Sequence, residues 1–321
     1  MTNPFIHSIE LSMSEIDEIQ ALIAQLQERY HSTDDQGFVR TLPEWVELLP
    51  TRLRIEVKKF RHQGHPLVVI KGYPDMSEKM GATPNHWKDV YNTNSNYDYY
   101  CCLMSSLFGD VVGFSDLQEG KLVQEIFPIK KDSDKQLGTG SVDLLLHTED
   151  TSLDYRADYI GFMCIRNNYR IPTSVSVPDF AKLSAKTVTL LKKNTFRIFN
   201  DRPCLSKEER DENYTICPLL TGDGKETYMR YDPLYLDKAA LNTEDLEAVA
   251  ELEALTEATV FDLVLTPGEI AFIDNYRCAH GRKAYQPRFD GTDRWLKRTQ
   301  ILTRLRDFKY LTLPGRINVL P

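Results

Sequence analysis

The segment LLLHTEDTS places a histidine and a carboxylate, His147 and Glu149, two residues apart at the end of an apolar run. If this run is a β-strand, residues i and i+2 face the same side, so the imidazole and the carboxylate project together. A second imidazole from a neighbouring strand would complete a set of two histidines and one carboxylate, which holds Fe(II) on one face and leaves three coordination positions open. H-x-E alone also occurs by chance, so the prediction depends on that second imidazole.

His280, in NYRCAHGR, is the candidate for the second imidazole because it follows the strand-like segment IAFID. Of the seven histidines, only His147 and His280 fall in the β-rich part of the chain; the others lie in the N-terminal region (His7, His31, His62, His65, His86).

Two arginines follow His280 and are four residues apart, Arg294 and Arg298, on a segment that we expect to be a strand over 295–305. On a strand, this spacing turns both side chains to one face. If that face is the interior, two buried guanidinium groups require two anions, and the planar fork of arginine suits a bidentate carboxylate. The alternative is a pair of surface arginines on an edge strand.

The elements that must position these residues indicate an α+β fold. Ser12 and Glu15 have capping-box spacing before an amphipathic helix, and a second helix is expected from Pro43 towards Phe60. From about residue 95 the chain reads as short strands separated by polar turns. A helical insertion, beginning with a helix over Pro178 to about Ile198, interrupts the strands at about 178–260 and is expected to cover one mouth of a β-barrel or sandwich. We treat residues 1–321 as one domain, with a helical N-terminal region over about 1–95.

Composition narrows the class of protein. The net charge of −8 argues against nucleic acid or an anionic membrane as a partner. None of the six cysteines forms a C-x-x-C pair, and no apolar stretch is as long as a membrane helix or resembles a signal peptide. We therefore expect a cytoplasmic protein whose partner is a small molecule; the sequence leaves the oligomeric state open.

Three motifs together resemble a known family: H-T-E at 147–149, H-G-R at 280–282, and P-R-F-D-G-T-D-R-W-L-K-R at 287–298. They are similar to the clavaminate synthase-like Fe(II)/2-oxoglutarate-dependent oxygenases, which include hydroxylases of free arginine, asparagine and lysine. The resemblance covers roughly residues 100–310. It implies a double-stranded β-helix (jelly-roll) core, an Fe(II) cofactor, 2-oxoglutarate as cosubstrate, and O2.

The same resemblance implies roles for individual residues. His147, Glu149 and His280 would bind iron, and Arg294 would bind the distal carboxylate of 2-oxoglutarate. Arg298 would bind the α-carboxylate of the substrate. The α-amino group of the substrate would contact Gln124, in LVQEIFPI, and the outer oxygen of Glu149.

Asp232, in MRYDPLYLD, matches a lid acid that binds the side-chain end of a basic substrate. Arginine hydroxylases of this family carry Asp-x-Asp here, whereas this chain has Leu234 at the second position. One carboxylate suits the compact ammonium of lysine, so we expect hydroxylation of L-lysine at C3 or C4. The resemblance slightly favours C4.

Several alternatives stay open at this point. Within the oxygenases they are arginine or asparagine as the substrate, and desaturation or ring closure as the reaction. Outside them they are a zinc hydrolase with a His2Glu site and a non-catalytic jelly-roll binding protein.

Overall fold

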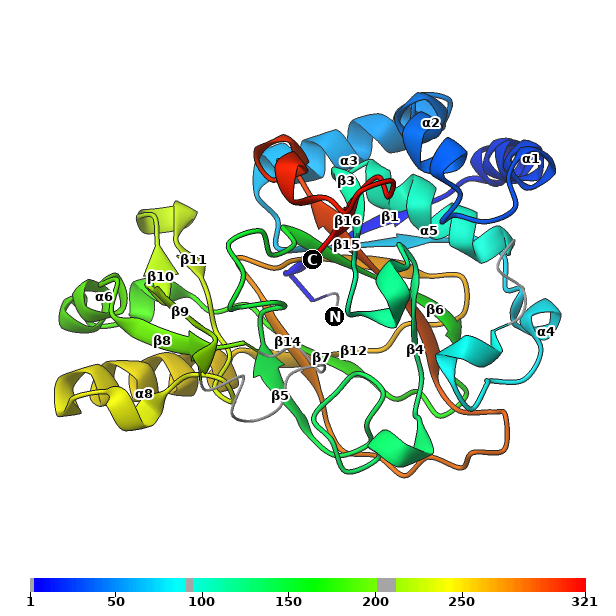
Figure 1. Cartoon of the computed structure of the whole chain (residues 1–321). Helices are drawn as coiled ribbons and strands as arrows, with labels where there is room; N and C mark the ends of the chain where they lie inside the picture. Colours follow the sequence, from blue (N-terminus) through cyan, green and yellow to red (C-terminus); the bar gives the residue numbers. More distant parts are fainter. Residues whose placement is uncertain (1–2, 91–94, 201–211) are drawn as a thin grey trace.

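Two facing β-sheets form the centre of the computed structural model, which describes residues 3–90, 95–200 and 212–321 (Figure 1). The large sheet has the strand order β1-β2-β13-β6-β15-β3-β16, with β4 also paired to β15, and the small sheet has the order β12-β7-β14-β5. The large sheet comprises β1 (Ile6–Glu10), β2 (Leu67–Lys71), β3 (Asp110–Phe114), β4 (Gln124–Ile126), β6 (Tyr159–Arg166), β13 (Ile270–Asp274), β15 (Trp295–Leu302) and β16 (Val319–Leu320). The small sheet comprises β5 (Leu144–His147), β7 (Thr173–Ser176), β12 (Val260–Leu263) and β14 (Ala279–Arg282).

Side chains of alternate residues along the large sheet enter two different cores. In β2, Leu67 and Val69 face the small sheet, whereas Val68 and Ile70 face the helices. The helices on that outer face are α1 (Met13–Arg29), α2 (Gln36–Val46), α3 (Thr51–Gln63) and α5 (Asn96–Ser106); α4 (Ser77–Met80) lies at the edge. Because both faces of the sheet are covered, its strands are apolar on both sides. The expected double-stranded β-helix core with N-terminal helices is confirmed.

The N-terminal region differs from the helical expectation in two ways. It supplies β1, a strand that was not expected, which pairs in parallel with β2. The apolar run PLVVI (66–70) does predict a buried strand at β2, which joins the large sheet beside β13. In place of one helix from Pro43 to Phe60 there are two, α2 and α3. Pro50 explains the break, since a residue that precedes proline is disfavoured in helical conformation.

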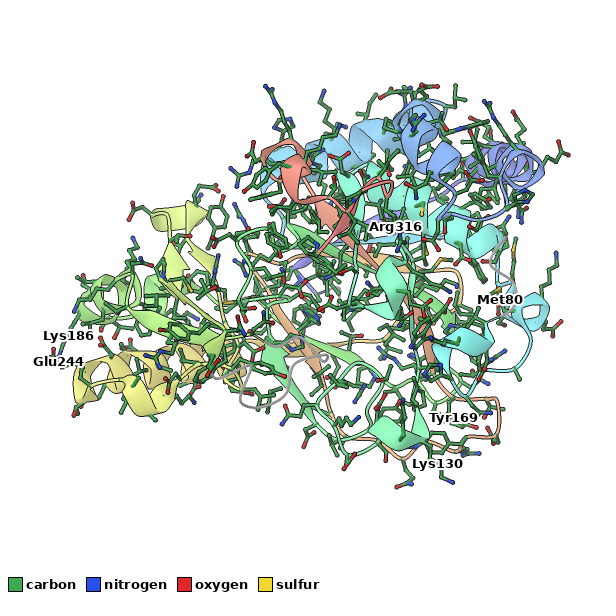
Figure 2. The ribbon with its side chains drawn as sticks, viewed as in Figure 1. Met80, Lys130, Tyr169, Lys186, Glu244 and Arg316 are labelled. Atoms are coloured by element: carbon green, nitrogen blue, oxygen red, sulfur yellow. The ribbon has the colours of Figure 1, made fainter. Side chains whose placement is uncertain are left out.

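The insertion over about 178–260 forms a lobe beside the sheets (Figure 1). It contains α6 (Ala185–Leu191), α8 (Thr243–Ala258), the strand pair β8 (Phe196–Phe199) with β9 (Tyr214–Cys217), and the pair β10 (Leu220–Thr221) with β11 (Tyr228–Met229). The expected helix from Pro178 to Ile198 is therefore mostly wrong: α6 is short, because the alternating sequence FRIF pairs as a strand with β9. Figure 2 shows Lys186 of α6 and Glu244 of α8 at the outer end of the lobe, where they pair at 2.8 Å.

The lobe packs on the outer face of the small sheet. Its apolar core includes Leu146 of β5 and Ala279 of β14, each the neighbour in sequence of a histidine that faces the other way. None of the helices in the described ranges is long and apolar enough to cross a membrane.

A buried ionic cluster joins β15 to the helical layer. Lys297 is fully buried, and its Nζ lies 2.7 Å from Asp98 Oδ1 on α5 and 2.5 Å from Glu125 Oε1 on β4. The indole of Trp295 donates to Glu125 Oε2 at 2.6 Å. Burial alone would lower the pKa of Lys297, but the two carboxylates outweigh it and raise this pKa. The cluster therefore holds a charged lysine between two carboxylates.

Replacing Lys297 with methionine should destabilise the fold, because two buried carboxylates would lose their cation. We expect Lys297→Met to reduce the free energy of unfolding in urea by about 3–5 kcal/mol. The control is Lys283→Met, which removes an exposed ion pair with Asp262 and should change stability by less than about 1 kcal/mol. Equal effects of the two substitutions would contradict this role for the cluster.

Candidate active site

Two histidines lie directly opposite each other in the small sheet. His147 ends β5, and antiparallel pairing places it across from His280 of β14, with ring centroids 4.6 Å apart. Glu149 follows two residues after His147, and its Oε2 lies 3.9 Å from Nε2 of His147 and 3.3 Å from Nε2 of His280. Ligand atoms of these three residues all lie within 4.8 Å of one another.

The Nε2 atoms of both histidines face the carboxylate of Glu149, which leaves the Nδ1 atoms on the far side of each ring. Nδ1 of His147 lies 2.8 Å from the carbonyl oxygen of Leu145, while Nδ1 of His280 is buried without a hydrogen-bond partner in the described parts of the chain. His280 also packs edge-on against Phe162 at 5.4 Å between centroids. Two imidazole nitrogens and a carboxylate oxygen converging from one side are a donor set that fits Fe(II).

Backbone contacts and charge both prepare Glu149 to act as a ligand. Its N–H donates to Asn275 Oδ1 at 2.7 Å, and Asn275 Nδ2 donates to its carbonyl oxygen at 3.1 Å. Burial would raise the pKa of Glu149, but the Arg298 guanidinium and the two imidazoles outweigh it and hold this pKa well below its usual range. The carboxylate is therefore ionised.

Arg294 is a buried guanidinium without a carboxylate partner among the described residues. It donates to Thr173 Oγ1 at 2.7 Å, and its Nε has no hydrogen-bond partner in those ranges. Burial, helped by the nearby charge of Arg282, lowers the pKa of Arg294 to about 10. An uncompensated cation in this position favours a bound anion.

The chain holds Arg294 in place through the turn that precedes β15. Both oxygens of the Asp293 carboxylate accept backbone N–H groups, from Arg288 at 2.9 Å and from Phe289 at 2.6 Å. Thr83 donates its hydroxyl to the carbonyl oxygen of Asp293 at 2.7 Å. Arg294 thus stands directly before β15, at the end of a braced turn.

Arg298 occupies the adjacent part of the cavity. It lies opposite Gln124 in the pairing of β15 with β4, and its Nε and one terminal nitrogen donate to Gln124 Oε1 at 2.8 and 2.5 Å. Its other terminal nitrogen contacts Glu149 Oε1. One guanidinium is thus flanked by two acceptor oxygens, a pattern that matches the carboxylate and ammonium of an amino acid.

Asp232 approaches from the lobe, three residues after β11. Its Oδ1 accepts the backbone N–H groups of Leu234 at 3.0 Å and Tyr235 at 3.4 Å. Burial raises the pKa of Asp232, while the charge of His147 acts in the opposite direction. Leu234 is 47% exposed and lies at the rim.

A cavity of about 410 Å³ connects all these groups. It is lined by the seven residues predicted from the sequence: Gln124, His147, Glu149, Asp232, His280, Arg294 and Arg298. Its size lies within the range of small-molecule sites. The structure therefore brings together every predicted site residue, from both sheets and from the lobe.

The cavity also contains residues that sequence reasoning missed. Thr173, Asp150 and Arg282 line it, as do Lys131 and Lys135 of the loop before β5. Thr173 lies in β7, and a threonine in a strand carries no functional signal. Arg282 belongs to the H-G-R motif and Asp150 follows Glu149, but the sequence analysis gave neither a role. Lys131 and Lys135 belong to no spacing that would distinguish them from surface residues.

Comparisons with known proteins agree with this geometry. Residues 187–300 match the family described as taurine catabolism dioxygenase TauD, TfdA family. The sequence is 31% identical to an L-ornithine/L-arginine 3-hydroxylase of Catenulispora acidiphila, over 94% of this chain and 95% of the relative. It is 30% identical to an enduracididine beta-hydroxylase of Streptomyces hygroscopicus, over 98% of this chain and 99% of the relative.

Solved structures are similar over nearly the whole chain. The crystal structure of the non-haem iron oxygenase OrfP in complex with Fe and α-ketoglutaric acid has a TM-score of 0.90 and 31% sequence identity, and the match covers 98% of this chain and 100% of that one. The expected resemblance is thereby confirmed, and the alternatives of a zinc hydrolase and a non-catalytic binding protein are set aside. The chain belongs to the TauD/TfdA family, as a non-haem Fe(II), 2-oxoglutarate-dependent oxygenase of the group that hydroxylates free amino acids.

Proposed function

We propose that this enzyme hydroxylates C3 of a free basic L-amino acid, with arginine as the first candidate substrate. The observation that carries this proposal is the buried carboxylate of Asp232, which comes from the lobe and lines the same cavity as Arg294 and Arg298. Its Oδ2 makes no hydrogen bond to any residue in the described ranges, so it can accept from a cationic side chain.

The relatives support both the substrate class and the carbon. The two at 30–31% identity are named as 3- and beta-hydroxylases, one of them acting on ornithine and arginine. OrfP has been solved in complex with L-Arg and with L-homoarginine. These names favour arginine over the lysine expected from sequence, and C3 over C4.

Lysine is the second candidate. Leu234 leaves Asp232 as the single acid of its turn, and one carboxylate suits an ammonium better than a guanidinium. Relatives named as L-lysine 4-hydroxylases are also similar, for example one of Chitinophaga pinensis at 28% identity over 86% of this chain and 76% of the relative.

The site residues divide into three groups in this proposal. His147, Glu149 and His280 hold Fe(II), which supplies the activation of O2 that oxidises a C–H bond. Arg294 and the hydroxyl of Thr173 bind the distal carboxylate of 2-oxoglutarate. Arg298 pairs with the substrate α-carboxylate, and Gln124 Oε1 and the outer oxygen of Glu149 accept from its α-ammonium.

Anchoring at both ends determines which carbon is presented to the metal. Arg298 contacts Glu149 directly, so an α-carboxylate held by Arg298 lies next to the metal ligands. Asp232 then draws the cationic end towards the lobe, which leaves the carbons nearest the α-carbon facing the three ligands. Closure of the cavity by substrate also excludes water from the reacting centre.

Removing either histidine should abolish turnover, because each supplies one of the three protein ligands of the proposed Fe(II) site. We expect His147→Ala and His280→Ala to lose detectable succinate formation and to bind Fe(II) at least about tenfold more weakly in anaerobic titrations. His86→Ala, at the rim of the same cavity, serves as the control and should keep metal affinity. Normal iron binding by both alanine variants of the paired histidines would rule out this ligand set.

The two arginines should have separable effects. Arg294→Ala should raise the KM for 2-oxoglutarate, and Arg298→Ala should raise the KM for the amino acid. Loss of a charged contact in a closed site costs about 2–5 kcal/mol, so each change should exceed about thirtyfold. Steady-state kinetics with each substrate varied in turn provides the measurement, and each variant is the control for the other. Identical effects on both substrates would refute the division.

A panel of amino acids and substitutions at Asp232 and Leu234 test the identity of the substrate. Incubation with Fe(II), ascorbate and 2-oxoglutarate against ornithine and the twenty common amino acids should give succinate fastest with arginine. Asp232→Asn keeps the shape and removes the charge, and should raise the KM of the basic substrate by at least about tenfold. Leu234→Asp should increase the preference for arginine over lysine.

Asp237→Asn is the matched control, because its carboxylate pairs with Arg197 in the same lobe, away from the cavity. Fast turnover of asparagine with arginine, ornithine and lysine inert would overturn the basic-substrate proposal and leave the oxygenase assignment intact.

A further inference from the structure

Arg156 is a second buried guanidinium without a carboxylate partner in the described ranges, and it does not line the active-site cavity. It lies before β6, 2% exposed, with its guanidinium carbon 3.9 Å from the centroid of the Tyr276 ring. Burial lowers its pKa to about 10, although the neighbouring tyrosine opposes this. Placing a cation here is costly, so its contacts indicate what it does for the protein.

The two ends of the guanidinium fork contact different segments. One terminal nitrogen donates to the carbonyl oxygen of Met229 at 2.7 Å, and the other donates to Thr148 Oγ1 at 3.0 Å and to the carbonyl oxygen of Asn275 at 3.5 Å. Thr148 lies between His147 and Glu149, in what we call the ligand turn (147–149). Met229 begins what we call the acid-bearing segment (229–232), which ends at Asp232.

The same two segments are joined a second time through Thr148 and Tyr231. The N–H of Thr148 donates to the carbonyl oxygen of Tyr231 at 2.7 Å, and the N–H of Tyr231 donates to Thr148 Oγ1 at 3.1 Å. The Thr148 hydroxyl oxygen is therefore shared by Arg156 and Tyr231. Asp232 is the next residue, so its distance from the ligand turn depends on this junction.

The planar guanidinium of arginine suits position 156 better than a lysine ammonium does. The acceptors on Met229 and Thr148 belong to chain segments 81 residues apart in sequence, and two donors at fixed separation can bridge them. A lysine ammonium is a single point of charge on a flexible stem and does not set that separation. Neither acceptor is charged, so the contacts determine geometry more than they neutralise Arg156.

We propose that Arg156 is a positioning residue for the substrate: it sets the distance between Asp232 and the ligand turn, and thereby which carbon of a basic amino acid lies at the metal. This rests on the proposed function only in that Asp232 binds the cationic end. The proposed 2-oxoglutarate contacts come from Arg294, directly before β15, and from Thr173 of β7; both lie outside this junction and should not depend on it.

The substitution Arg156→Lys tests the proposal. Arg230→Lys is the matched control, because Arg230 belongs to the acid-bearing segment but pairs with the exposed Asp154. Arg156→Lys should raise the KM for the amino acid at least about tenfold and change the ratio of 3- to 4-hydroxylated product. The dissociation constant for 2-oxoglutarate, measured anaerobically by calorimetry, should change less than about twofold. Arg230→Lys should leave all three quantities near those of the wild type.

Hydrogen exchange of the unliganded protein gives a readout that does not depend on substrate identity. In Arg156→Lys the acid-bearing segment should exchange at least about tenfold faster, while β15 stays protected. Thr148→Val, which removes the shared hydroxyl, should reproduce this change if Arg156→Lys folds poorly. Unchanged exchange in both variants, or equal losses of affinity for both substrates, would overturn the proposal; a wild type that accepts no basic amino acid would instead overturn the proposed function.

Discussion

The alternation of side chains along β15 is the constraint on which this active site depends. One strand carries Lys297 on the face covered by helices and Arg298 on the face lined by the cavity. Neither cation can be buried alone, so each is neutralised by a separate set of acceptors: Asp98 and Glu125 on one face, Glu149 on the other. A shift of β15 by one residue would exchange the two faces and leave both sets unpaired. The register of this strand is therefore determined electrostatically as well as by apolar packing.

The charges inside the cavity are arranged by sign. Arg294 has no carboxylate partner in the part of the chain that the structure describes, Arg298 shares Glu149 with the histidines, and Asp232 supplies negative charge from the lobe. Under the proposed function, a dianionic cosubstrate beside Arg294 and a zwitterion whose cationic side chain meets Asp232 would complete this pattern. Since interactions between charges are strong where water is excluded, the cavity selects its ligands by charge before shape.

Local patterns in the sequence predicted the parts of this molecule that depend on local physics. The capping box at Ser12 is present as expected, with Ser12 and Glu15 bonded in both directions, and the spacing of His147 and Glu149 placed both on one edge. Patterns failed where the deciding partner lies far along the chain. β1 is defined by its pairing with β2, and β8 by its pairing with β9. The role of Arg156 could not be predicted from the sequence either, because its acceptors become neighbours only after folding.

The opposite orientations of Leu146 and His147 have a consequence for how such an enzyme diversifies. Leu146 packs into the core of the lobe, whereas the next residue faces the metal position. Repacking beneath the lobe would therefore tilt His147, a proposed metal ligand, and selection against the loss of activity would remove such changes. Rim positions such as Leu234 have no such connection, because that side chain is largely exposed. Changes in substrate specificity should therefore accumulate at the rim, while the packing between the lobe and β5 is conserved. Mutant libraries that aim at new substrates should vary the rim residues and leave β5 unchanged.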